Sequence, residues 1–135
     1  MRVAIVYALP SKKPAPDYVQ GLAKGIESMG HRVDLIDAWA EEGMKLPAYE
    51  YVAVVAEPVS VFSGKIPDIT AKTLSAGSSL VGKKSAAFIK KTGLFTNSAF
   101  TNLMKVMEKE GMRINWSDIL FNAPHAEAIG KYIGA

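Results

Sequence analysis

Residues 51–56 read YVAVVA, and this stretch decides the fold that the sequence predicts. The run is apolar almost throughout, without a regular alternation of apolar and polar side chains. A strand of this composition has both faces covered, so it belongs in the middle of a parallel sheet. We expect the segments before and after it to supply the neighbouring strands and the helices that cover both faces.

Other short apolar runs alternate with amphipathic segments along the chain. The expected strands are residues 3–8, 32–37, 51–56, 85–89 and 113–121. Such alternation is typical of β/α units on a parallel sheet, and the imperfect apolar pattern of residues 32–37 indicates a strand near an edge. We predict an α/β fold in which residues 1–135 form a single domain, with five parallel strands and helices on both faces of the sheet.

The first helix is delimited by a capping residue and a glycine. Asp17 is the expected N-cap, and Gly30 is expected to end the helix in a left-handed conformation. Apolar residues recur at helical spacing on one predicted face: Val19, Leu22, Ile26 and Met29.

Three further helices are expected. Asp68 is the predicted cap of a helix that continues to about Val81, and Gly111 is expected to end a later one. Asn122 is the predicted cap of a short closing helix. The inward residues of the first two are predicted to be Ile69, Thr73, Ala76 and Leu80, then Phe100, Leu103, Met104 and Met107.

Composition narrows the class of protein. The chain is 49% hydrophobic and 21% charged, values that are ordinary for a soluble globular protein. It has no apolar run of membrane-spanning length, no signal-peptide pattern and no cysteine. We expect a cytoplasmic protein without disulfides and without a membrane partner.

The charge does not predict nucleic-acid binding. The formal net charge is +3, the lysines are dispersed, and aromatic residues are not interleaved with them. Two histidines at unrelated positions predict no metal site. Ser11 and Ser60 lack a histidine at plausible range, and no G-x-S-x-G motif is present, so we assign no catalytic residue. Trp39 is interpreted as a packing residue that lines the sheet edge.

In open α/β sheets, ligands bind at the carboxyl ends of the strands, where the strand order reverses. The rule selects the loops after the first, third and fourth strands. Four stretches of the sequence resemble flavodoxin-like proteins: MRVAIVYA, ESMGHRVDLID, EYVAVVAEPVSVFSGKIP and GKKSAAFIKKTG, which begin at residues 1, 27, 50 and 82. The resemblance implies strand order 2-1-3-4-5 and an FMN cofactor at the carboxyl edge.

The first loop departs from the family pattern. Flavodoxins hold the flavin phosphate there with Ser or Thr residues, a glycine and the N-terminus of the following helix. Residues 9–17 read LPSKKPAPD, in which three prolines lack an N–H, no glycine is present, and Asp17 adds negative charge. The residues left as candidates for the phosphate are Ser11, Lys12 and Lys13.

The other two loops keep more of the pattern. The resemblance implies that Phe62 and Phe95 flank the isoalloxazine ring, while both residues remain open to the alternative that they only cover the sheet edge. Further candidate cofactor-binding residues in these loops are Val59, Ser60, Ser63, Gly64, Thr92 and Gly93. Glu57 either pairs with Lys12 or Lys13, or points into solvent.

Two functions follow. The first is a flavodoxin-like FMN-binding redox protein. Electron-carrier flavodoxins are strongly acidic, so the positive charge of this chain favours a flavin or quinone reductase relative, or a carrier for an acidic partner protein. The alternative is a flavodoxin-fold domain that has lost FMN and acts as a binding or regulatory module. A receiver domain is excluded, because Leu9-Pro10 and Glu57-Pro58 do not supply its acidic cluster and phosphoacceptor.

Overall fold

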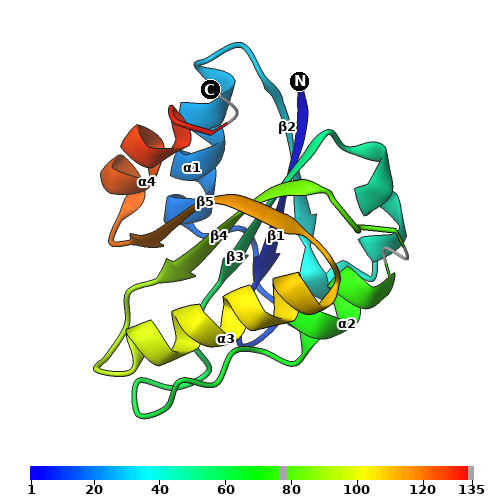
Figure 1. The fold of residues 1–135 in the computed structure, drawn as a ribbon. Helices are drawn as coiled ribbons and strands as arrows, with labels where there is room; N and C mark the ends of the chain where they lie inside the picture. Colours follow the sequence, from blue (N-terminus) through cyan, green and yellow to red (C-terminus); the bar gives the residue numbers. More distant parts are fainter. Residues whose placement is uncertain (77–78, 134–135) are drawn as a thin grey trace.

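The computed structural model describes residues 1–76 and 79–133. Within these residues, five parallel strands form one sheet in the order β2-β1-β3-β4-β5 (Figure 1). The strands are β1 (Arg2–Ala8), β2 (Arg32–Asp37), β3 (Tyr51–Ala56), β4 (Lys84–Lys90) and β5 (Arg113–Leu120). The predicted fold class, strand order and parallel direction are confirmed, and β2 and β3 have the predicted bounds.

The central strand is the most protected part of the sheet. Every residue of β3 is at most 1% exposed, because β1 and β4 pair with its two sides and helices cover both of its faces. The edge strands β2 and β5 have mixed burial patterns, as their alternating polar residues require. The central position predicted for this strand from its continuous apolar run is therefore confirmed.

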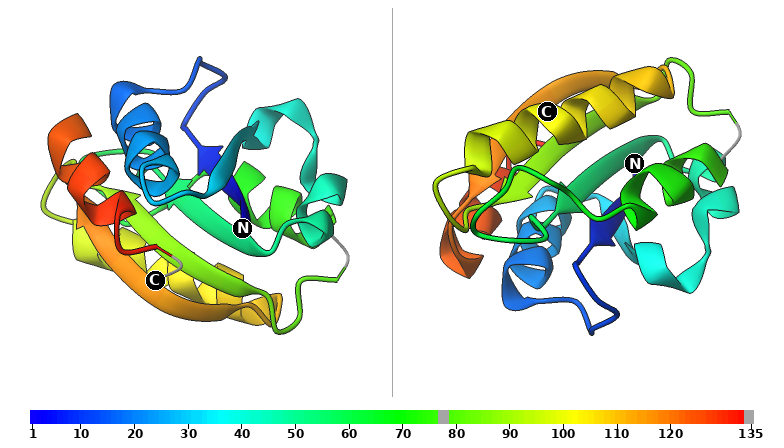
Figure 2. Two further views of the ribbon diagram at one scale, coloured as in Figure 1. Left: turned by 90° about the horizontal axis from the view of Figure 1, so that it is seen from above. Right: turned by 90° about the horizontal axis from the view of Figure 1, so that it is seen from below.

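Helices lie on both faces of the sheet (Figures 1 and 2). One face carries α1 (Asp17–Glu27) and α4 (Ala123–Gly130), and the other carries α2 (Ile69–Ala76) and α3 (Thr96–Lys109). Two short 3₁₀ helices, η1 (Ala38–Ala40) and η2 (Gly43–Ala48), extend the second layer and were not expected from the sequence.

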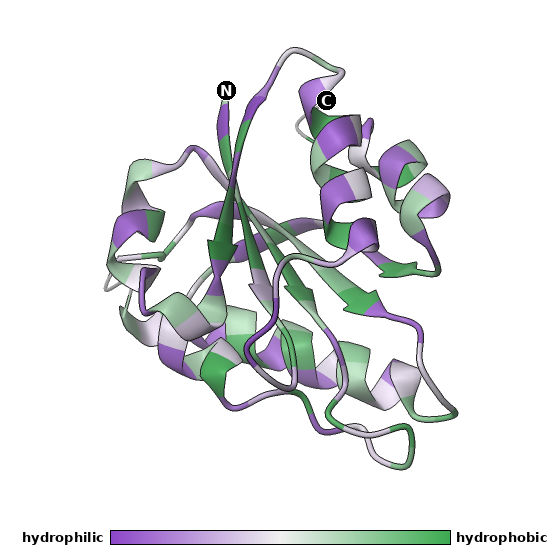
Figure 3. Cartoon of the chain, turned by 180° about the vertical axis from the view of Figure 1, so that it is seen from behind, coloured by the Kyte–Doolittle hydropathy of each residue, from purple (hydrophilic) through white to green (hydrophobic). Residues whose placement is uncertain are grey.

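The sheet separates two apolar cores. Val3, Ile5 and Tyr7 of β1 pack with α1 and α4, whereas Ala4 and Val6 pack with α2, α3 and the 3₁₀ segments. Alternate side chains of a strand point to opposite faces, so one apolar strand contributes to both cores. Figure 3 shows the hydrophobic character of the central strands between the more polar helices.

Several helix ends differ from the prediction. Asp17 is the first residue of α1 instead of its N-cap; the cap is Pro16, whose side chain makes no capping bond. Because α1 ends at Glu27, Met29 lies beyond it and is 54% exposed rather than packed. Gly30 does have the expected positive φ of 89°, in the turn that follows.

The helix expected from Asp68 to Val81 is shorter than predicted. α2 ends at Ala76, which is exposed, and Val81 lies in a turn before β4. Residues 77 and 78 of the predicted helix lie outside the described residues. By contrast, the Asn122 cap is confirmed, since its side chain accepts a hydrogen bond of 2.9 Å from the His125 N–H.

Over the described ranges, 1–76 and 79–133, no helix is both long enough and apolar enough to span a bilayer.

Candidate functional site

Three loops share the carboxyl edge of the sheet, as predicted. They are residues 9–16 after β1, 57–68 after β3 and 91–95 after β4. Ala8 pairs in register with Ala56, and Ala56 with Ile89, so the three strands end nearly level. Figure 1 shows the loops after β3 and β4 next to the start of α3.

The loops after β3 and β4 contact each other through backbone. A Cβ added at Gly93 would overlap the carbonyl oxygen of Val61, and one added at Gly64 would lie 2.5 Å from Cβ of Ser98 in α3. The Asn102 side chain also donates a hydrogen bond of 2.7 Å to the Gly64 carbonyl. Both glycines are therefore required by close approach, and they lock the two loops and α3 together.

Internal hydrogen bonds shape the loop after β3. The Val59 N–H donates to the Lys65 carbonyl at 2.9 Å, and the Phe62 N–H donates to the Ser60 hydroxyl at 3.0 Å. The Lys65 N–H donates to the Ser63 hydroxyl at 3.3 Å. These bonds fold the part of the loop around Phe62 into a compact turn. The Ser60 hydroxyl can still donate a hydrogen bond to a further partner.

A buried threonine organises the loop after β4. The Thr96 hydroxyl donates to the Gly93 carbonyl at 2.8 Å and accepts from the Thr92 N–H at 3.3 Å. Thr92 is a candidate cofactor-binding residue, but its N–H is already paired, so the hydroxyl of this half-buried residue is the side-chain group left for a ligand. Thr96 was not singled out from the sequence, although a threonine at a helix start is a recognised capping signal.

Apolar side chains are exposed on these two loops. Phe62 is 83% exposed, Leu94 94% and Phe95 44%. We call the exposed apolar side chains of the two loops the apolar rim: Val59, Val61, Phe62, Leu94 and Phe95. Large exposed apolar patches rimmed by polar residues often mark binding sites, so these side chains are candidates for ligand contact.

The loop after β1 is held at its ends. The Trp39 indole N–H donates to the Leu9 carbonyl at 2.9 Å, and the Gln20 side chain donates to the Ala15 carbonyl at 2.8 Å. Between these anchors Ser11, Lys12 and Lys13 are exposed. Trp39 therefore packs at the carboxyl edge, as predicted, and connects the end of β2 to this loop.

Glu57 lies where the first loop and the third strand meet. Its N–H donates to the Ala8 carbonyl at 3.1 Å, and its carboxylate accepts from the Tyr18 hydroxyl at 3.4 Å. Burial, followed by the negative charge and hydrogen bond of Glu57, raises the pKa of Tyr18. Lys90 lies over the same phenol ring, 5.4 Å from its centroid.

Neither alternative considered for Glu57 is correct. The carboxylate is half-buried against Tyr18 instead of pointing into solvent. The ion pairs among the described residues are Lys24–Glu127, Lys45–Glu42 and Lys72–Glu41. Glu57 therefore does not neutralise Lys12 or Lys13 by direct contact.

The residues present fit the two ends of FMN differently. The apolar rim suits a flat aromatic ring, and Ser60 and Thr92 offer hydroxyls beside it. The start of α1 does not form a backbone nest for a phosphate, because three of its preceding residues are prolines without an N–H and Asp17 is negative. By the chemistry of their side chains, the residues at this edge suit a flat aromatic ring better than a phosphate.

The histidines lie apart from the rim. His31 is at the amino edge, where its Nδ1 lies 3.2 Å from the amino nitrogen of Met1. His125 contacts Phe121 edge to face, with ring centroids 5.1 Å apart. Across residues 1–76 and 79–133, no group of three or more acidic or histidine side chains is arranged to hold a metal ion.

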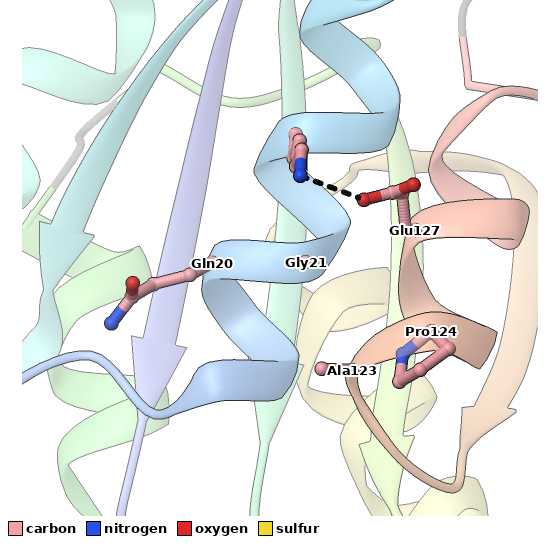
Figure 4. Close-up of a pocket in the computed structure, with 6 residues that line it drawn as sticks. Gln20, Gly21, Ala123, Pro124 and Glu127 are labelled. Carbon is pink, nitrogen blue, oxygen red and sulfur yellow. Dashed lines mark ion pairs between the residues drawn. The ribbon is translucent and has the colours of Figure 1, made fainter.

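A hollow of about 440 Å³ lies between α1 and α4, on a face of the sheet (Figure 4). Lys24 and Glu127 form an ion pair of 3.7 Å across it. The two helices approach closely beside it, since a Cβ at Gly21 would lie 2.5 Å from the Ala123 carbonyl oxygen. This glycine contact escaped sequence reasoning, because the partner helix is about a hundred residues away in the chain.

Comparison with solved structures identifies the fold. Flavodoxin 2 from Bacillus cereus matches with a TM-score of 0.74 at 15% sequence identity, over 96% of this chain and 95% of that chain. A flavodoxin from the domain Archaea matches with a TM-score of 0.71 at 18% identity, over 98% and 96%. The Megasphaera elsdenii flavodoxin matches with a TM-score of 0.71 at 15% identity, over 96% of both chains.

The open doubly wound sheet of this chain is thus the flavodoxin fold. No protein-family model matches the sequence, and no curated protein matches it.

Proposed function

We propose that this chain is a flavodoxin-like redox protein that binds a flavin, of which FMN is the form used by flavodoxins, at the carboxyl edge of its sheet. The observation that carries the proposal is the apolar rim, in which Phe62 and Phe95 are exposed on two loops that are locked together. Large aromatic side chains held open on ordered loops favour a flat apolar ligand.

The chain's own residues have separate tasks in this proposal. Phe62 and Phe95 flank the ring and exclude water from it. The neighbouring loop residues meet the polar edge of the ring: Val59, Ser60, Gly64, Thr92 and Gly93. Ser11, Lys12 and Lys13 are the groups closest in sequence to the place of a phosphate. The bound flavin would supply the redox chemistry, while the protein sets the polarity around it.

The charge around the rim points to an acidic redox partner. Lys12, Lys13, Lys65 and Lys91 are exposed on the three loops of the carboxyl edge, and the chain has a net charge of +3. Lysines around an apolar surface favour the approach of a negatively charged protein. A carrier for such a partner is the function we favour, and a flavin or quinone reductase is the alternative within the redox class.

The test is the visible absorbance of the protein purified without added cofactor, followed by titration of the colourless fraction with FMN. Flavin absorbance that copurifies with the chain, or saturable quenching of FMN fluorescence, supports the proposal. A protein that stays colourless, and whose tryptophan fluorescence does not respond to micromolar FMN, contradicts it. Trp39 is a suitable reporter because its indole lies at the carboxyl edge.

A second function is favoured by the first loop. Its three prolines and the acidic residue at the start of α1 are what a fold that has lost its phosphate site would show. In that case the apolar rim is the contact surface of a binding or regulatory module. Absence of flavin binding together with a partner whose binding is lost in Phe62→Ala would support this second function.

A further inference from the structure

Two negatively charged side chains, Asp17 and Glu57, lie at or near the first turn of α1. Asp17 is the first residue of the helix, and the Glu57 carboxylate lies 3.4 Å from the hydroxyl of the next residue, Tyr18. Asp17 also contributes to raising the pKa of Tyr18, after the burial of the phenol and the effects of Glu57. Two carboxylates therefore act on the place where a helix N-terminus would otherwise attract a phosphate.

Backbone donors are scarce at the same place. Pro10, Pro14 and Pro16 have no N–H. The Val19 N–H, one of the first-turn donors of α1, donates to the Pro16 carbonyl at 3.1 Å, so the first turn has one fewer free donor. A phosphate here would lack the convergent N–H groups that make an anion nest.

The available cations do not supply the missing geometry. Lys12 and Lys13 are exposed, and neither is among the ion pairs of the described residues. A lysine on an exposed loop acts on an anion as a hydrated point charge that salt screens. Lys90 lies over Tyr18 and donates to the Lys91 carbonyl at 3.1 Å, so it is already engaged by the protein.

From these observations, and resting on the proposed flavin-binding function, we propose that the site recognises the isoalloxazine ring and not the phosphate. Riboflavin and FMN then bind with nearly equal affinity. The ring end is held by the apolar rim, while the attraction and repulsion of the phosphate nearly cancel. The ligand class is therefore the flavins, and the site does not distinguish between them by the group attached to the ring.

The experiment is a parallel titration of the full chain with riboflavin and with FMN, followed by quenching of flavin fluorescence. We expect the two dissociation constants to agree within about threefold. FMN binding that is tighter than riboflavin binding by about a hundredfold or more overturns the inference while the proposed function stands. Binding of neither flavin removes the proposed function, and the inference with it.

A charge variant tests the electrostatic cause. Asp17→Asn removes one negative charge at the start of α1, and it should tighten FMN binding by about two- to fivefold while riboflavin binding stays the same. Glu108→Gln, which removes one exposed negative charge near the end of α3 and away from the carboxyl edge, is the control and should leave both affinities unchanged. An Asp17→Asn variant that affects both flavins equally, or neither, overturns the inference.

Discussion

The loop after β1 and the two loops after β3 and β4 lie on the same edge of the sheet, but different contacts hold them in place. Prolines stiffen the first loop, and hydrogen bonds from Trp39 and Gln20 hold its ends. The other two loops are held by each other, through close approach of Gly93 to Val61 and of Gly64 to α3.

This difference indicates which loops would contact the proposed ligand. The first loop needs no ligand to hold its shape, because its own prolines stiffen it. Its exposed charged groups are lysines in contact with solvent. The paired loops present Phe62 and Phe95 to solvent. Exposing these apolar side chains is unfavourable, and the packing of the loops does not bury them. We therefore propose that the paired loops recognise the flavin ring and that the first loop has mainly a structural role.

Separating the paired loops is expected to have the largest effect. In Gly93→Ala the new methyl group overlaps the Val61 carbonyl, so one loop must move. Overpacking of this kind costs about 1–3 kcal/mol in the free energy of unfolding, and flavin binding should be lost as well. Urea denaturation and flavin titration measure the two effects.

Ser11→Ala is the control for that variant, because Ser11 is exposed on the first loop. It should change stability by less than about 0.5 kcal/mol and leave the binding of riboflavin, which has no phosphate, intact. If Ser11→Ala weakened binding and Gly93→Ala did not, the roles assigned to the two regions would be reversed.

Removing the rim aromatics should affect binding alone. Phe62→Ala and Phe95→Ala are each expected to weaken flavin binding by about 1–3 kcal/mol, by analogy with the stacking of bases on aromatic side chains. Unfolding should change little for Phe62, which is mostly exposed. Fluorescence titration gives the affinity, and thermal denaturation gives the stability.

Met29→Ala provides the comparison for these aromatic variants. Met29 is also an exposed apolar residue, but it precedes β2 at the opposite edge of the sheet. It should leave flavin affinity unchanged. Equal affinities for the wild type and both phenylalanine variants would show that the ring does not bind at the rim.

Local sequence patterns predicted the strands and most of the helices, whereas contacts between segments distant in the sequence could not be predicted. The apolar run of β3 and the Asn122 cap depend on neighbours in sequence, and both were predicted correctly. Asp17 was given the wrong role because Pro16, which fits the helix start by its backbone, competes for the cap position. The contact of Gly93 with Val61 joins the loop after β4 to the loop after β3, and no local sequence pattern indicates it.

Alkaline pH tests the bond that joins the two regions, between Glu57 after β3 and Tyr18 after the first loop. Tyr18 keeps its proton more strongly when folded, so above pH 10 the unfolded chain loses that proton first. Stability should therefore fall with rising pH, by about 1.4 kcal/mol per pH unit for each such tyrosine.

The variants Glu57→Gln and Tyr51→Phe separate the contributions to this slope. Burial alone raises the pKa of Tyr51, whereas Glu57 adds to the effect of burial at Tyr18. Glu57→Gln should move the Tyr18 titration toward its ordinary range, and Tyr51→Phe should remove a step that Glu57→Gln leaves in place. Tyrosinate absorbance follows each titration, and an unaltered Tyr18 titration in Glu57→Gln would disprove the contact.

The smallest effect is expected from relaxing the first loop. Pro14→Ala gives the unfolded chain more conformations and should lower stability by about 0.4–1 kcal/mol, with riboflavin affinity unchanged. Lys13→Ala, the adjacent exposed residue, is the control and should alter stability by less than about 0.5 kcal/mol. Because the proline acts through the unfolded state, denaturation reports it and ligand titration does not. Loss of riboflavin binding in Pro14→Ala would mean that the first loop shapes the ring site, and the contrast between the two regions would no longer hold.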